Sequence, residues 1–328
     1  QNISHAPERL RWSPVHGCSD PLTAILRARA LTAGAKISGL RDGEFWDAMA
    51  QAVVRCYLHA ADLEGLPVRD VVSWISRPAD PTPVRILRAQ GGAAEGWAEE
   101  LSAQAAADQR QRDSVWACVR RAFDSLADPR VMESCSPGQQ DAFEANRFLD
   151  EQGTLYLVGS AGAQLSVAPL VSALIEDVVE CGRRRAAESP GGRLDPPLLL
   201  RLDEAANIAP IPSLPSLLSD GGGSGITTVA VLQSLAQARG RWGDAHAEAM
   251  WDAATVKVVI GGLPHAEDLN RISRLAGEID DVTESQTRGP SGRSVSTSVR
   301  RLPALPVERI RGLAVGSAIV LGRRARPV

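Results

Sequence analysis

Two carboxylates follow an apolar run that is typical of a buried strand. The run is Leu198-Leu-Leu-Arg-Leu202, and Asp203 and Glu204 come directly after it. Ligands of parallel α/β sheets bind beyond the carboxyl ends of the strands, where P-loop enzymes also hold magnesium on an aspartate. Asp203 is therefore a candidate to orient hydrated Mg²⁺, and Glu204 to polarise an attacking water. The alternative is that the two acids only begin a loop or cap a helix.

A glutamine ends the next predicted strand. Gln233 closes the run Val229-Ala-Val-Leu-Gln233, and Gln237 lies one helical turn further along. A neutral amide can sense a γ-phosphate or position water without adding charge. Gln233 is a candidate for that role beside the two carboxylates. Gln237 either faces the same cleft or belongs to a solvated helix start.

Neither glycines nor lysines supply a phosphate loop within these 328 residues. The stretch Gly221-Gly-Gly-Ser-Gly225 follows a predicted helix and precedes a strand. A phosphate loop needs the opposite order, so a sharp turn is predicted instead. Only two of the 36 basic residues are lysines, Lys36 and Lys257, and neither follows a glycine. A Gly-Lys-Ser or Gly-Lys-Thr P-loop is therefore missing from this sequence.

The composition is that of an ordinary globular protein and excludes several other classes. Apolar residues make up 44% of the chain, with 36 basic and 39 acidic residues. That balance excludes low-complexity disorder and a collagen-like fibre, and no apolar run is long enough for a membrane helix. The five cysteines and five histidines have no zinc-ligand or hydrolase spacing.

Basic residues gather near the C-terminus. Residues 271–328 contain eleven arginines and five acids, although the net charge of the chain is −3. Two polar runs, residues 283–288 and 294–301, flank Gly289–Gly292 and predict an exposed hairpin. Four arginines of this hairpin are candidate DNA-phosphate contacts, although a solvated charged hairpin is the more common case: Arg288, Arg293, Arg300 and Arg301.

Changes of periodicity predict an α/β protein with an inserted all-α domain. Residues 1–44 contain a helix that Asp20 caps and Gly34 closes. Residues 45–150 show only helical periodicity, and their Trp97 and Trp116 are expected in the core rather than stacked on bases. Residues 151–328 alternate strands with helices, which predicts a parallel sheet flanked by helices. Its strands are expected near 154–158, 197–203, 226–233, 255–260 and 317–321. Helices are expected at 244–253 and 266–276.

Beyond these patterns, the sequence closely resembles the conjugative coupling proteins of the TraG/TraD family, which are ATPases of type IV secretion. The resemblance covers most of the chain, and it is most specific between the two acids and Gly277. The matching runs are Asp203-Glu-Ala-Ala-Asn-Ile208, Pro215-Ser-Leu-Leu-Ser219, Val231-Leu-Gln-Ser-Leu-Ala-Gln237, Lys257-Val-Val-Ile-Gly-Gly262 and Asp268-Leu-Asn-Arg-Ile-Ser-Arg-Leu-Ala-Gly277.

The resemblance implies a RecA-like motor domain that binds ATP and Mg²⁺, with an inserted all-α domain that meets DNA or relaxosome cargo. In such a protein Asp203 and Glu204 fall on the Walker B acids, and Gln233 on the strand-end glutamine. The implied partners are single-stranded DNA, relaxase and relaxosome proteins, and the type IV secretion channel. The implied assembly is a homohexamer anchored on the cytoplasmic side of the plasma membrane.

Two departures from the family pattern modify these expectations. The Walker A loop and the membrane anchor are expected upstream of residue 1, so residues 1–328 alone are expected to bind ATP weakly or not at all. Many relatives also carry a basic residue in the turn that corresponds to the one before Gly225-Ile226. Such a residue could act as an arginine finger that contacts the neighbouring subunit. Here the turn holds glycines and a serine, so the candidates for this trans-acting arginine are Arg239, Arg241 and Arg271.

Two other functions remain open from the sequence. One is a relaxosome-recognition adaptor that never hydrolyses ATP, and the other is a DNA translocase of the FtsK/HerA kind.

Overall fold

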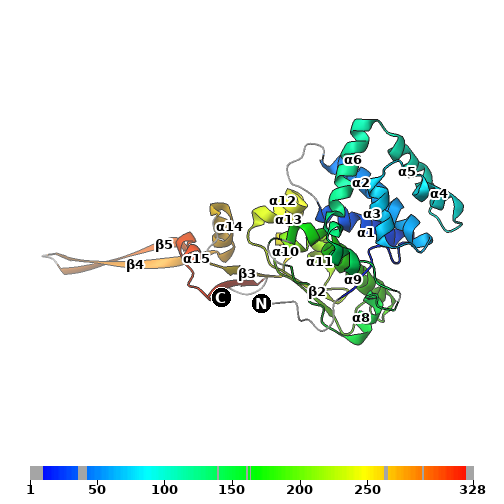
Figure 1. Ribbon diagram of the computed structural model, residues 1–328. Coiled ribbons are helices and arrows are strands. Elements are labelled where there is room, and N and C mark those ends of the chain that lie inside the picture. Colours follow the sequence, from blue (N-terminus) through cyan, green and yellow to red (C-terminus); the bar gives the residue numbers. More distant parts are fainter. Residues whose placement is uncertain are drawn as a thin grey trace. The chain divides into compact units, whose positions relative to one another are not determined.

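The computed structural model divides into two compact units (Figure 1). The first comprises Gln1–Gln233 and Gln237–Met250, and the second Ser234–Ala236 and Trp251–Val328. The structure describes residues 10–35, 43–138, 140–159, 162, 164–261, 265–289 and 292–322. Both units combine helices with strands, so the predicted α/β class is confirmed.

The first unit begins with helix α1 (Pro21–Gly34), whose start was visible in the sequence. The carboxylate of Asp20 accepts hydrogen bonds from the backbone N–H groups of Leu22 and Thr23, at 3.4 and 3.1 Å. These donors have no partner inside the helix, and Pro21 suits its first turn. Gly34 was expected to close this helix, but it is the last helical residue and Ala35 is the C-cap. A Cβ on Gly34 would lie 2.6 Å from the Cα of Pro169, so this glycine lets two helices approach closely.

Helices alone occupy the described residues between Gly43 and Glu151, as the sequence predicts. They pack around the fully buried Tyr57 and Trp116, while Trp97 is half-buried and stacks under the guanidinium of Arg55. Trp116 is thus a core residue. The elements are α2 (Gly43–Leu63), α3 (Val68–Ser76), α4 (Thr82–Ala89), α5 (Trp97–Ala106), α6 (Gln109–Ala122), the 3₁₀ helix η2 (Asp124–Ala127), α7 (Pro129–Ser134) and α8 (Ala145–Glu151).

Helix α9 (Gln164–Glu188) contributes to two cores of the first unit. Its first half packs with α1 and the helices above, and its second half packs under a parallel pair of strands. These strands are β1 (Leu198–Leu202) and β2 (Ile226–Ala230), in the register Leu198↔Ile226 to Leu202↔Ala230. The connection between them holds α10 (Ala205–Ile208) and α11 (Leu214–Asp220). Helices α12 (Leu235–Trp242) and α13 (Asp244–Ala253) follow β2.

The second unit has its own small core, formed by β3 (Val256–Ile260), α14 (Ala266–Ala276), α15 (Val307–Arg311) and β6 (Ala318–Gly322). Strand β3 pairs antiparallel with β6, so that Val258 lies opposite Val320. The predicted hairpin is present and longer than expected, with β4 (Glu278–Gly289) against β5 (Gly292–Pro303). The turn predicted at Gly221–Gly225 is also present, and Gly225 takes the left-handed φ of +80°.

Two details of the predicted sheet are wrong. Residues 154–158 are not a strand, because no other described strand pairs with them, and a strand exists only through its ladder of hydrogen bonds. Strands β3 and β6 were expected in the same parallel sheet as β1 and β2, but among the described residues they form an antiparallel pair of their own.

Candidate functional site

The two acids that follow β1 lie where the chain turns from the strand into helix α10. Glu204 occupies the N-cap position of α10 with a left-handed φ of +47°, which is unusual for a residue other than glycine. Its carbonyl oxygen accepts the backbone N–H groups of Asn207 and Ile208, at 2.8 and 3.1 Å. The next N–H, of Ala205, donates to the carbonyl of Val231 at 3.1 Å. This sharp turn is therefore tied to the end of β2.

Two amide side chains hold the carboxylate of Glu204. Asn207 Nδ2 donates to Oε2 at 3.1 Å, and Gln233 Nε2 donates to Oε1 at 3.4 Å. Gln237 extends the chain of amides, because its Nε2 donates to Gln233 Oε1 at 3.1 Å. Its Oε1 accepts the backbone N–H of Gln233 at 3.3 Å. The structure thus brings Glu204, Gln233 and Gln237 together, and of the two readings of Gln237 it supports the shared site.

Asp203 is exposed at the same strand end. Its Oδ1 accepts the backbone N–H of Glu204 at 3.0 Å, which fixes the direction of the side chain. An exposed carboxylate is a hard oxygen ligand of the kind Mg²⁺ prefers, usually through its own waters. Among the described residues no cluster of three or more acids, histidines or cysteines could hold a metal directly.

Asn207 was not singled out from the sequence, although a signal for it exists. It lies three residues after Glu204, and residues at this spacing share one face of a helical turn. The sequence could not show that Glu204 would stand at the start of such a turn.

The arginines proposed to act between subunits all contact groups of their own chain. Arg239 Nη2 lies 3.3 Å from Glu248 Oε1, and its Nε lies 4.0 Å from Asp244 Oδ1. Arg271 pairs with Asp252 Oδ1 at 3.2 Å, and its guanidinium stacks over Trp251 at 5.0 Å.

Arg241 contacts the helix that follows the two acids. Its Nε donates to the carbonyl of Ala206 in α10 at 2.7 Å, and burial lowers its pKa. The neighbouring Trp242 donates its Nε1–H to the carbonyl of Ile211 at 2.9 Å. Helix α12 is in this way fastened to the segment that follows Glu204.

The hairpin arginines are only partly described. Arg300 and Arg301 are exposed on β5, and Arg301 pairs with Asp280 at 3.7 Å. The strand register places Arg288 opposite Arg293, but the side chains of these two residues lie outside the described part of the structure.

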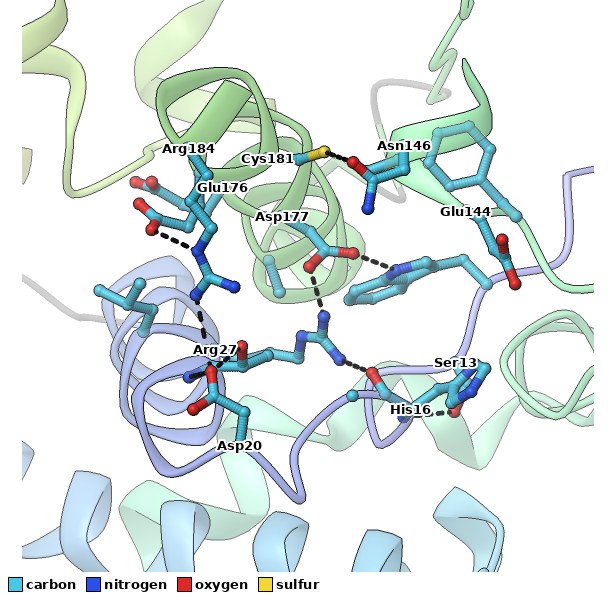
Figure 2. Close-up of a pocket in the computed structure, with 18 of the residues that line it drawn as sticks. Ser13, His16, Asp20, Arg27, Glu144, Asn146, Glu176, Asp177, Cys181 and Arg184 are labelled. Atoms are coloured by element: carbon cyan, nitrogen blue, oxygen red, sulfur yellow. Dashed lines mark hydrogen bonds and ion pairs between the residues drawn. The ribbon is translucent and has the colours of Figure 1, made fainter. Parts of the chain in front are cut away.

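A separate polar cleft of about 510 Å³ lies in the first unit, between the segment around Trp12, helix α1, and helices α8 and α9 (Figure 2). Its lining includes six carboxylates and three arginines, Arg27, Arg184 and Arg185. The arginines are paired with carboxylates around the cleft. None of the site residues predicted from the sequence lines this cleft.

The strand ends and the helices around them match a known family. Residues 197–314 match the family model described as the TraM recognition site of TraD and TraG. This part of the chain is therefore similar to the TraD and TraG proteins. The matched segment includes Asp203, Glu204 and Gln233, and also the candidate arginines of α12, α14 and the hairpin.

Several solved structures have a similar fold. The unbound form of the bacterial conjugative coupling protein TrwBΔN70 has 19% sequence identity and a TM-score of 0.66, and the match covers 92% of this chain. Its trigonal form with sulphate has 19% identity and a TM-score of 0.67 over the same share. TrwB with ADP and Mg²⁺ has 18% identity and a TM-score of 0.64, over 97% of the chain. The predicted RecA-like fold is thereby confirmed.

The chain spans 66% of the length of the first two of these structures, and 69% of the third. No curated protein matches this chain. Among the helices that the structure describes, none has the length and apolar character needed to cross a membrane.

Proposed function

We propose that this chain is part of a coupling ATPase that recruits a relaxosome and drives single-stranded DNA into a type IV secretion channel. The observation that carries the proposal is the grouping of Asp203, Glu204 and Gln233 at the ends of two parallel strands, inside the matched TraD and TraG segment. Solved TrwB structures with ADP and Mg²⁺, and with an ATP analogue, support nucleotide and Mg²⁺ as the ligands.

In this proposal the residues act by positioning and by charge, as phosphoryl transfer requires. Glu204 accepts a proton from the attacking water, and Asp203 orients the waters of the magnesium ion. The ion, when bound, neutralises charge that develops on the phosphates. Gln233 donates a hydrogen bond of 3.4 Å to Glu204. When Gln233 moves on binding or losing the γ-phosphate, this hydrogen bond changes the position of the Glu204 carboxylate.

In this proposal the phosphate-binding P-loop is supplied by sequence outside these 328 residues, because neither Lys36 nor Lys257 follows a glycine. The all-α region meets DNA or relaxosome cargo, and the exposed Arg300 and Arg301 touch phosphates together with Arg288 and Arg293. The full assembly is a homohexamer at the cytoplasmic face of the plasma membrane. One of Arg239, Arg241 and Arg271 reaches the neighbouring subunit, after release from its present partners.

ATP hydrolysis by the full-length gene product, measured with and without single-stranded DNA, tests this proposal. Glu204→Gln should lower kcat by a factor of at least about 10², because it removes the general base while leaving nucleotide binding in place. The matched control is Glu267→Gln at an exposed position of α14, which should retain the wild-type rate. A Glu204→Gln protein that hydrolyses ATP at the wild-type rate would disprove the assignment of Glu204 as the general base.

A second candidate is an adaptor that recognises relaxosome proteins and never hydrolyses ATP. The description of the matched family as a recognition site favours it. A wild-type gene product that binds a relaxosome protein but shows no hydrolysis at any DNA concentration would select the adaptor over the motor.

A further inference from the structure

Both oxygens of the Glu204 carboxylate accept a hydrogen bond from an amide, and the two amides come from different segments. Asn207 lies in α10, directly after the turn, whereas Gln233 is 29 residues from Glu204 in the sequence and follows β2. The Asn207 bond is the shorter of the two, at 3.1 Å against 3.4 Å, and its donor stands only three residues from the acceptor. Asn207 is also half-buried, so its amide is poorly replaced by water.

The backbone around this pair is fixed on both sides. The carbonyl of Glu204 accepts two N–H groups of α10, including that of Asn207, and Ala205 donates to Val231. Asn207 is thus tied to Glu204 twice, once through its backbone and once through its side chain. The left-handed backbone of Glu204 aims the side chain, and the Asn207 amide holds the end of it.

We propose that Asn207 is a positioning residue that orients the Glu204 carboxylate toward the attacking water. This inference rests on the proposed function and adds to it a residue that touches the base rather than the substrate. A carboxylate has two oxygens, and a base presents one of them to water. Asn207 donates its hydrogen bond to Oε2. When nucleotide binds, Oε1 gives up its longer hydrogen bond with Gln233 and accepts one from the attacking water instead. A base held in one orientation reacts faster than one that rotates freely.

Three variants of the full-length gene product test the role in catalysis. Asn207→Ala should lower kcat by about tenfold to a hundredfold and leave the KM for ATP unchanged, because binding does not use this amide. Asn207→Asp places a second carboxylate beside Glu204, so the acidic limb of the kcat/KM profile should move to higher pH. Asn270→Ala, at an exposed position of α14, is the matched control and should behave as wild type.

A spectroscopic measurement on residues 1–328 tests the contact without any hydrolysis. The side-chain amide signals of ¹⁵N-labelled Asn207 should move in Glu204→Gln, which alters the acceptor of its hydrogen bond, and should keep their positions in Glu267→Gln. An Asn207 amide that does not contact Glu204 would keep its signals in both variants.

The outcomes separate this inference from the proposed function. An unchanged kcat in Asn207→Ala, or an unmoved pH profile in Asn207→Asp, overturns the inference while an active wild type upholds the ATPase. If the wild-type protein does not hydrolyse ATP, the proposed function fails, and the amide signals decide alone. Signals that move in Glu204→Gln and not in Glu267→Gln then support the contact of Asn207 with the carboxylate, and signals that Glu204→Gln leaves unmoved overturn it.

Discussion

Arg27 and Asp177 form a partly buried ion pair that joins α1 to α9 across 150 residues of sequence (Figure 2). Arg27 Nη2 lies 2.5 Å from Asp177 Oδ1, and 4% of the arginine side chain and 25% of the aspartate side chain are exposed. The other oxygen of Asp177 accepts the indole N–H of Trp12 at 3.1 Å. Arg27 Nη1 donates to the carbonyls of Pro14 and His16. Both charges therefore have several partners, which is what makes such a pair tolerable away from water.

Removal of Asp177 should destabilise the first unit strongly. Asp177→Ala leaves the guanidinium of Arg27 buried without its counter-charge, so we expect a loss of about 3–5 kcal/mol in the free energy of unfolding. The exposed pair Arg147–Glu151 is the control, and Glu151→Ala should cost no more than about 1 kcal/mol. Urea unfolding followed by far-UV circular dichroism measures both. Equal midpoints for the two variants would contradict the buried role of the pair.

Glycine should be better tolerated than alanine at position 204, because the backbone there is left-handed. Glu204→Gly and Glu204→Ala both remove the carboxylate and its amide contacts, so their difference isolates the backbone. We expect the glycine variant to be more stable by about 1 kcal/mol.

The opposite order is expected in the middle of α9. At Glu180 both substitutions remove the same contact with Arg184, and the glycine variant should be less stable than the alanine variant by about 1 kcal/mol. Chemical denaturation of the four variants gives the two differences. The same sign at both positions would rule out the left-handed turn.

Glu176 should make stability depend on pH. Burial raises the pKa of its carboxyl, although its Oε1 accepts the backbone N–H of Ser213 at 2.8 Å. Above the unfolded pKa of about 4.3, the unfolded chain loses this proton while the folded chain keeps it. The folded protein then binds more protons, so this residue makes stability fall as pH rises, until the folded pKa is passed.

Glu176→Gln keeps the acceptor for Ser213 and removes the titration. The free energy of unfolding of this variant, minus that of wild type, should therefore increase from pH 4 upward and level off above the folded pKa. Denaturation series between pH 4 and pH 8 measure this difference, and Glu267→Gln serves as an exposed control. A difference that stays constant across this range would be inconsistent with a raised pKa.

Gly34 should not accept a side chain, although it lies in a helix. A Cβ there would lie 2.6 and 2.8 Å from the Cα and N of Pro169, which are backbone atoms of α9. The helices must separate to make room, so Gly34→Ala should cost about 1–3 kcal/mol. Gly91 is the control, because a Cβ added there would have no neighbouring atom within 4 Å. Gly91→Ala should therefore be neutral or slightly stabilising. Thermal unfolding compares them, and equal melting temperatures would refute the close approach.

Local patterns predicted the helices of this chain well. The helices expected at 244–253 and 266–276 have these bounds in the structure, and Asp20 caps α1 as its position before Pro21 suggested. Capping contacts and helical periodicity both involve residues three or four positions apart, so a short stretch of sequence is enough to recognise them. The acids after β1 and the glutamine after β2 were found for the same reason, since each directly follows an apolar run.

Tertiary structure decided how those elements pair and how the candidate base is held. Strand β3 takes a partner about sixty residues away in antiparallel order, and residues 154–158 have none among the described strands, because ladder hydrogen bonds depend on distant chain. The left-handed turn at Glu204 and the Asn207 amide on its carboxylate depend on where β1 meets α10. The sequence alone thus determined the resemblance to a known family and the acids at the strand end. Only the fold showed which side chains touch Glu204, because those contacts form in three dimensions.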